Sequence, residues 1–235
     1  TTLAYKSFAN LVSEADAVVI GTVRKLESVY APNKEIYTFV TFDQLDVLNG
    51  TYSGTTLTLR LKGGEIDGDI LHIEGSPNFT VDARVLLFVQ GNGRDLVPMV
   101  GWTQGIFLIS SDPATRTEII HDHDGNRVLG ITNGHVRKEK VHQSEAHIIQ
   151  PSGSTRSAAD VSSDPGLADN AAPLAPNQKA VLKQAPAMSA QSFVATLKQA
   201  ASAKTARLAA AKVAPIPLKS VEPTDLITES DTRDA

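Results

Sequence analysis

Alternation of apolar and polar side chains along the first half of the chain predicts a series of β-strands. In residues 56–62, the leucines at 57, 59 and 61 alternate with polar residues and therefore lie on one face of a strand. Residues 17–24 are apolar enough for a buried strand, with Gly21 indicating a bulge or a close backbone approach. Residues 35–48 are rich in β-branched and aromatic side chains. Further strand-like runs occupy residues 70–75, 84–91, 95–101 and 104–110, and a last pair flanks a turn at 124–126.

Turn-forming residues separate these runs, which favours an antiparallel arrangement. They are Asn49-Gly50, Gly63-Gly64, Gly91-Asn92-Gly93 and Asp124-Gly125. Ahead of the first strand, Ser7 or Asn10 caps a short helix with Phe8, Leu11 and Val12 on its apolar side. We therefore predict a mainly β fold, an antiparallel barrel or sandwich preceded by an N-terminal helix.

The composition changes near residue 150. All four Tyr, the single Trp and six of the seven Phe precede that point, whereas the remaining residues hold eight of the 12 Pro and 20 Ala. A segment with so few aromatic side chains buries too little apolar surface to offset the entropy of its own ordering. We predict a β-barrel domain over residues 1–150 and an extended Ala/Pro-rich tail over 151–235. Within the tail, Ser189 caps a helix over about 189–212, with Phe193 and Leu197 on one stripe.

Cysteine content and charge exclude several classes of protein. The chain has no Cys, which excludes disulfides, thiolate metal sites and a cysteine nucleophile. The net charge of −4, without a long basic run, argues against nucleic-acid binding. No apolar run approaches the roughly 18 residues of a membrane-spanning helix. Because the first residue is Thr1, we expect a protein processed on export, with its signal peptide removed, that is secreted or held at the cell surface. The absence of Cys favours a bacterial protein over a small eukaryotic secreted domain.

Short motifs in residues 8–110 resemble a group of poorly characterised exported bacterial proteins with an OB-like barrel of the netrin/TIMP type. The motifs are Leu-Val-x-x-Ala-Asp from Leu11, Val-Ile-Gly-Thr-Val at 19–23, Asp-Val-Leu-Asn-Gly at 46–50, Lys-Gly-Gly at 62–64, Gly-x-Pro-x-Phe at 75–79, Leu-Leu-Phe at 86–88 and Gln-Gly-x-Phe at 104–107. The resemblance implies an OB-like fold for the body. TIMP-like inhibitors place an N-terminal cysteine on a protease zinc, and this chain has none.

Candidate chemistry is confined to two clusters. His121 and His123, within His-Asp-His-Asp, are candidate ligands for a first-row metal, although the same residues suit the tip of a hairpin. Three carboxylates at 65, 67 and 69 lie in a glycine-rich stretch, but their spacing does not match a calcium loop, which favours a solvated turn. The sequence contains no nucleophile-elbow, zinc-protease or phosphate-loop motif. We expect no enzymatic activity and no cofactor.

The tail supplies the remaining candidates, which are apolar residues for contacts between subunits. They are Ile148, Ile149, Val181, Leu182, Phe193, Leu197, Ile216 and Leu218. Docking on its own body and docking on a neighbouring subunit both remain open. The favoured hypothesis is a non-enzymatic, exported structural protein whose tail docks on neighbouring copies to form a polymer or surface filament. The alternatives are an inhibitor-like binding module that acts on an exported protease, and a metal-dependent enzyme. The expected partner is the chain itself or another exported protein.

Overall fold

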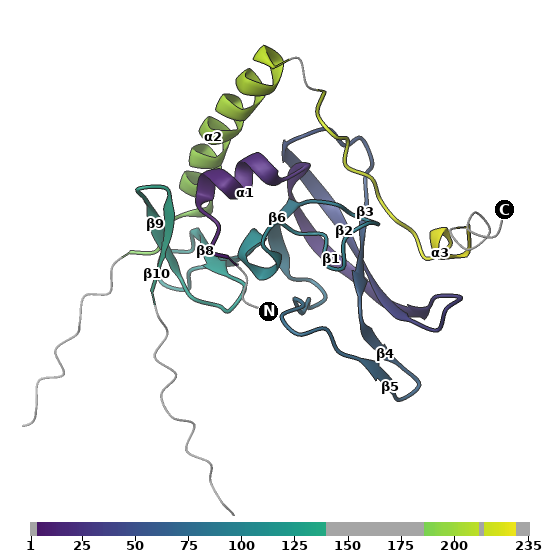
Figure 1. Ribbon diagram of the computed structural model, residues 1–235. Coiled ribbons are helices and arrows are strands. Elements are labelled where there is room, and N and C mark those ends of the chain that lie inside the picture. Colours follow the sequence, from purple (N-terminus) through teal and green to yellow (C-terminus); the bar gives the residue numbers. More distant parts are fainter. Residues whose placement is uncertain (1–3, 140–185, 212–213, 229–235) are drawn as a thin grey trace, which may run out of the picture. The chain divides into compact units, whose positions relative to one another are not determined.

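The computed structural model describes residues 4–139, 186–211 and 214–228 (Figure 1). Its fold is mainly antiparallel β, with one helix near the N-terminus and a longer one in the C-terminal region, as predicted. The helices are α1 (Phe8–Glu14), the 3-10 turn η1 (Trp102–Gly105), α2 (Ala190–Ala210) and α3 (Asp225–Thr228). The strands are β1 (Ala17–Tyr30), β2 (Ile36–Asn49), β3 (Leu57–Lys62), β4 (Gly64–Ile66), β5 (Asp69–Leu71), β6 (Arg84–Val89), β7 (Ile106–Ser111), β8 (Glu118–Asp122), β9 (Val128–Thr132) and β10 (His135–Lys138).

Six of the strands form one sheet, in the order β3-β2-β1-β6-β7-β8. The longest pair, β1 with β2, shifts register between Ile20 and Thr22, where Gly21 lies. This shift confirms the bulge predicted at Gly21, and a Cβ there would sit only 2.9 Å from Cδ2 of Leu45. Hairpins β4–β5 and β9–β10 form two further small sheets. Within the described residues, the two outer strands β3 and β8 pair with one neighbour each and not with one another.

One predicted strand is absent and another is shorter than expected. Residues 95–101 form a loop that touches the sheet at a bridge between Met99 and Val89. The hydrogen bonds at this contact include one from Lys62 N–H to the Leu96 carbonyl oxygen at 2.8 Å and one from Val100 N–H to the Phe88 carbonyl oxygen at 2.9 Å. Pro98 lies in the middle of this run and has no N–H for a ladder, which explains the interruption. Of residues 70–75, only Ile70 and Leu71 belong to a strand, β5.

Alternation along the central strands buries both faces of the sheet. On β6, Leu86 and Phe88 belong to one apolar cluster, whereas Val85, Leu87 and Val89 belong to another. The first cluster is covered by α1 and α2. The second also receives the three leucines of β3 and residues of the loop before η1. A strand buried on both faces explains why residues 84–91 read as a nearly continuous apolar run.

Helix α1 begins directly after Ser7, one of the two capping residues predicted for it. The hydroxyl of Ser7 accepts a hydrogen bond from the N–H of Asn10 at 3.1 Å, so Ser7 is the capping residue. Phe8, Leu11 and Val12 are buried against the first cluster. The predicted apolar side of this helix is therefore its packed side.

Helix α2 extends the first cluster with residues from the predicted tail. Ser189 caps it through the N–H of Ser192 at 3.1 Å, and Phe193, Leu197 and Ala201 point into the core at every fourth position. Residues 186–211 and 214–228 belong to the same compact unit as residues 4–139. The predicted domain boundary near residue 150 lies outside the described residues and stays a prediction. None of the helices in the described ranges has the length and hydropathy needed to span a membrane.

Candidate functional site

The outer edge of β3 is covered by an extended segment, residues 214–222, which we call the edge segment. Val221 N–H donates to the carbonyl oxygen of Thr58 at 3.1 Å, and Thr58 N–H donates to the hydroxyl of Ser220 at 2.8 Å. Before β3, Leu218 N–H donates to the carbonyl oxygen of Thr51 at 3.2 Å. An edge strand presents unpaired backbone groups that can bind another chain. Here, residues more than 150 positions later in the sequence bind them.

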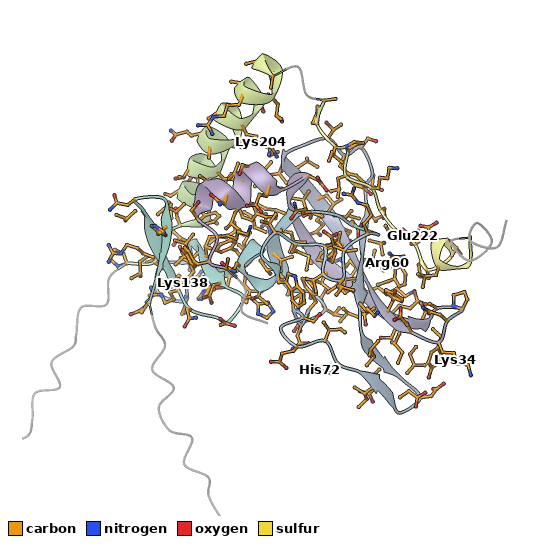
Figure 2. The ribbon with its side chains drawn as sticks, viewed as in Figure 1. Lys34, Arg60, His72, Lys138, Lys204 and Glu222 are labelled. Atoms are coloured by element: carbon orange, nitrogen blue, oxygen red, sulfur yellow. The ribbon has the colours of Figure 1, made fainter. Side chains whose placement is uncertain are left out.

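Asn92 connects the edge segment to β3 through its side-chain amide. Its Oδ1 accepts from Arg60 N–H at 3.0 Å, and its Nδ2 donates to the carbonyl oxygens of Thr58 at 2.9 Å and Lys219 at 2.7 Å. Arg60, labelled in Figure 2, is itself buried. It lies over the ring of Tyr37 and hydrogen-bonds to the Gly93 carbonyl. The side-chain amide of Asn92 thus hydrogen-bonds to backbone groups of β3 that a neighbouring strand would otherwise pair with.

Two leucines anchor the C-terminal residues to the body. Leu218 is only 6% exposed and belongs to the second apolar cluster. Leu226, in α3, is buried against Phe39 of β2. Val221, between these two leucines, is half-buried. Ile216, which precedes Leu218, is 55% exposed. The C-terminal residues are therefore held by a small number of separate contacts.

The opposite edge of the sheet, at β8, is also covered by residues from the C-terminal region. Met188 N–H donates to the carbonyl oxygen of Val128 at 2.7 Å, and Ile120 N–H donates to that of Met188 at 3.3 Å. An isolated antiparallel bridge joins Ile119 to Ser189, the cap of α2. Both outer strands of the sheet are thus bound by residues that follow position 185.

Helix α2 is fixed on the body by aromatic packing and by one ammonium group. The ring of Phe193 lies 5.4 Å from that of Phe8 and 4.9 Å from that of Phe107, centroid to centroid. The Nζ of Lys204 donates to the carbonyl oxygen of Ala15, the C-cap of α1, at 2.5 Å. Burial lowers the pKa of Lys204, and the nearby carboxylate of Asp16 offsets part of this effect. A cation is favoured at this end of α1 because its last carbonyls lack helical partners.

The structure distributes the predicted contact residues among three environments. Ile148, Ile149, Val181 and Leu182 lie outside the described residues. Phe193, Leu197 and Leu218 are buried against their own chain. Ile216 is exposed. The sequence left open whether these residues dock on their own body or on a neighbouring subunit. In this structure Phe193, Leu197 and Leu218 dock on their own body. Contact with a neighbouring subunit stays a prediction.

The two candidate metal ligands are hydrogen-bonded to different parts of the chain. His121, in β8, accepts from the Ser110 hydroxyl at Nε2, 2.9 Å away, and its Nδ1 donates to the Gly125 carbonyl at 3.2 Å. His123 follows the end of β8, and its Nε2 accepts from Asn78 N–H at 3.3 Å. Among residues 4–139, 186–211 and 214–228, no three His, Asp or Glu side chains are grouped so as to hold a metal ion.

Between the two histidines, Asp122 has a structural role that the sequence did not indicate. Its carboxylate is buried and bonds Lys138 Nζ at 2.8 Å and Asn126 Nδ2 at 2.9 Å. Burial alone would raise the pKa of Asp122, but the hydrogen bonds from Lys138 and Asn126 outweigh it, so the pKa is lowered. Asp122 thus fastens β10 and the 122–126 turn to the end of β8.

Comparisons with protein-family models, with curated proteins and with solved structures found no match.

Proposed function

We propose that this protein is a non-enzymatic, exported assembly protein whose edge segment binds the β3 edge of neighbouring copies and links them into a polymer. The observation that carries the proposal is the position of residues 214–222 beside β3. The segment is held there by a backbone hydrogen bond to Thr58, another to Thr51 before the strand, a bond from Thr58 N–H to the Ser220 hydroxyl, and one buried leucine. Backbone pairing to an exposed sheet edge, with side-chain anchors for specificity, is a recurring mode of peptide recognition.

The contacts of the edge segment are the same whether the segment belongs to the same copy or to another one. Exchange of an identical element between copies creates no new interface, so it needs only a connection that permits both arrangements. When each copy gives its segment to the next, the contact is head-to-tail. Such contacts generate an open chain of subunits when the rotation from one copy to the next does not close a ring.

Burial of α2 defines which part of the C-terminal region is able to exchange. Phe193 and Leu197 are fully buried in the first cluster, so removing α2 would open the core. The contacts of the edge segment begin only after this helix and rest on Leu218, Val221 and Leu226. The exchangeable unit is therefore residues 214–228, and the helix stays with the body.

The experiment compares the full chain with a protein that ends at Ala211. Light scattering over a wide range of concentrations should show larger species for the full chain and a single small species for the truncated protein. Leu218→Asp should also prevent assembly, because it places a charge at a buried anchor. Thr224→Asp adds the same charge at an exposed position of the same region and serves as the matched control.

A second measurement separates lost assembly from lost folding. A synthetic peptide of residues 214–228 should bind the truncated protein in trans, and its Leu218→Asp form should not. Circular dichroism should show that the truncated protein keeps its β signal. The proposal would be contradicted if the truncated protein assembled as the full chain does. It would also be contradicted if the truncated protein were folded and did not bind the peptide.

A further inference from the structure

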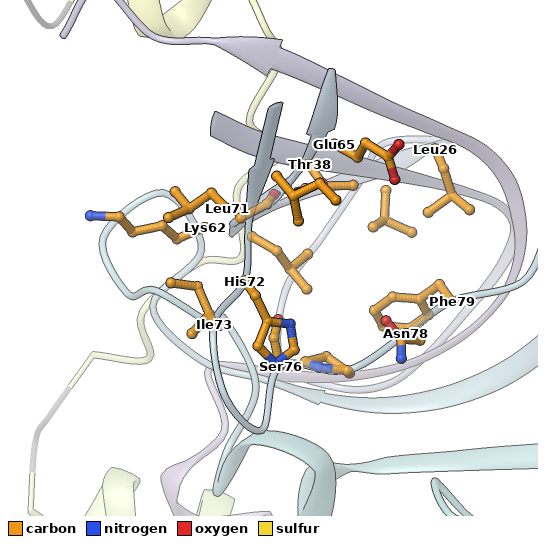
Figure 3. A pocket seen from close by; sticks show the side chains of 16 residues that line it. Leu26, Thr38, Lys62, Glu65, Leu71, His72, Ile73, Ser76, Asn78 and Phe79 are labelled. Atoms are coloured by element: carbon orange, nitrogen blue, oxygen red, sulfur yellow. Dashed lines mark hydrogen bonds between the residues drawn. The ribbon is translucent and has the colours of Figure 1, made fainter. Parts of the chain in front are cut away.

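A separate surface, remote in sequence from the edge segment, lies beside the β4–β5 hairpin. The hairpin and the loop after it border a pocket of about 340 Å³ (Figure 3). The apolar part of its lining includes Leu26, Val40, Leu61, Ile70, Ile73 and Phe79. Val40 and Leu61 are buried in the second cluster and form a fixed floor. The volume is near the lower end of the range for ligand sites, roughly 300–1,000 Å³, and suits one or two aliphatic side chains.

Apolar side chains also stand at the rim of this pocket, where water reaches them. Ile70 is 70% exposed and Leu26 is 40% exposed. Single exposed apolar residues are ordinary on protein surfaces. In this case two of them adjoin the same apolar hollow, and contiguous apolar surface of this kind is characteristic of binding sites.

The surroundings of the pocket are acidic. Residues 63–83 contain Glu65, Asp67, Asp69, Glu74 and Asp82 and no Lys or Arg. Asp82 is neutralised by Arg24 at 2.7 Å. The other four carboxylates have no lysine or arginine ion-pair partner among the described residues. Asp69 accepts a hydrogen bond from the Tyr30 hydroxyl at 2.8 Å, which fastens the hairpin to the end of β1.

The positive charge nearest to the pocket is already paired. Lys62 lines the pocket, but its Nζ lies 2.5 Å from Oε1 of Glu35. The hydrogen bond from Lys62 is the main cause of the lowered pKa of Glu35. His72, also in the lining, has an exposed ring that lies 3.4 Å from Glu74. A ligand therefore meets an apolar hollow with net negative charge around it.

We propose that this pocket binds a segment of a partner protein that presents a leucine or isoleucine side chain with lysines or arginines on both sides. The aliphatic side chain fills the hollow against Leu61 and Phe79, and Ile70 covers it. The flanking cations lie near Glu65, Asp67 and Glu74, where they raise the association rate and select against acidic segments. This inference does not depend on the assembly function, because no residue of the edge segment lines the pocket.

The test uses the full chain and a synthetic fluorescent peptide, Gly-Lys-Lys-Ala-Leu-Ala-Lys-Lys-Gly. Fluorescence anisotropy should show saturable binding that weakens as salt is added. Replacing the central leucine of the peptide with serine should weaken binding about tenfold, as expected for the loss of one buried aliphatic side chain. Replacing its lysines with glutamates should abolish binding.

Variants of the protein locate the binding site. Ile70→Ser should weaken binding about fivefold or more, and it is not expected to disturb folding because this side chain is mostly exposed. Tyr5→Ser changes another exposed side chain, 57% exposed, which does not line the pocket, and should leave peptide binding unchanged. Glu65→Gln combined with Asp67→Asn should reduce the dependence on salt.

Three results would overturn this inference. They are the absence of saturable binding, equal binding of the leucine and serine peptides, and equal binding by the Ile70→Ser protein. The second result would show attraction between charges without use of the pocket. Light scattering of the Ile70→Ser protein should match that of the parent, so a failure here is distinguishable from a failure of the assembly proposal.

Discussion

Replacing Phe193 with alanine tests whether α2 is part of the folded body. The ring is fully buried between Phe8 and Phe107, with centroid distances of 5.4 and 4.9 Å. Removing a buried phenylalanine ring typically costs about 3–5 kcal/mol, which includes the cavity left behind. Domains of this size are stable by only about 5–15 kcal/mol, so the loss is a large share of the total. We expect Phe193→Ala to lower the free energy of unfolding by about 3–5 kcal/mol.

The assay is urea unfolding, followed by circular dichroism and by the fluorescence of Trp102, the only tryptophan. Trp102 packs against the second apolar cluster, on the opposite face of the sheet from α2. If α2 and the sheet unfold as one unit, both signals should shift to lower urea together. Gln199→Ala, on the exposed side of α2, is the matched control and should change stability by less than about 0.5 kcal/mol.

Two outcomes would refute this reasoning. A loss smaller than about 1 kcal/mol for Phe193→Ala would mean that the helix does not pack on the body as described. An unfolding midpoint that rises with concentration in the protein that ends at Ala211, which lacks the edge segment, would mean that the helix is supplied by another copy. In that case the exchangeable unit would have to begin before α2.

Three further predictions concern single contacts. Leu218→Ala should lower the free energy of unfolding by about 2 kcal/mol or more, whereas Ile216→Ala should change it by less than about 0.5, both measured by urea titration. The lowered pKa of Asp122 stabilises the fold above the unfolded-state pKa of about 3.9 and loses this effect as the pH falls through the folded-state pKa. The stability difference between the parent and Asp122→Asn, about 1–3 kcal/mol near pH 7, should therefore shrink below about pH 4, and a constant difference would exclude the ion pair as its cause. Gly50→Ala should cost clearly more than Gly125→Ala in thermal melts, because both have positive φ but only a Cβ at Gly50 would clash, 2.6 Å from the Asp16 carbonyl oxygen.

Local patterns predicted the two longer helices and most strands of the main sheet, but not the loop at 95–101. The alternating leucines of β3, the caps at Ser7 and Ser189 and the bulge at Gly21 all depend on near neighbours in the sequence. The interruption at Pro98 follows from the same local rules, because proline has no N–H for a ladder. The apolar run around it nevertheless suggested a strand.

The candidate sites depend on contacts between distant residues, which a single sequence does not display. The tail is too poor in aromatic residues to fold alone, but Phe193 and Leu218 each join an apolar cluster that the body already contains. Asn92 reads as part of a glycine-rich turn, and nothing in its neighbourhood indicates that it binds β3 and the edge segment. The acidic stretch around Glu65 was recognised, whereas the apolar pocket beside it needs Leu26 and Phe79 from other segments.

Coverage of both sheet edges by the end of the chain has a consequence for biosynthesis. A ribosome that has completed β8 has produced every strand of the main sheet, but Met188 and Leu218 have not yet been made. During that interval the outer strands β3 and β8 have free backbone groups and are open to pairing with other nascent chains. Completion of folding therefore waits until the edge segment has been synthesised. The risk of misassembly depends on the time needed to translate the stretch between β10 and the edge segment.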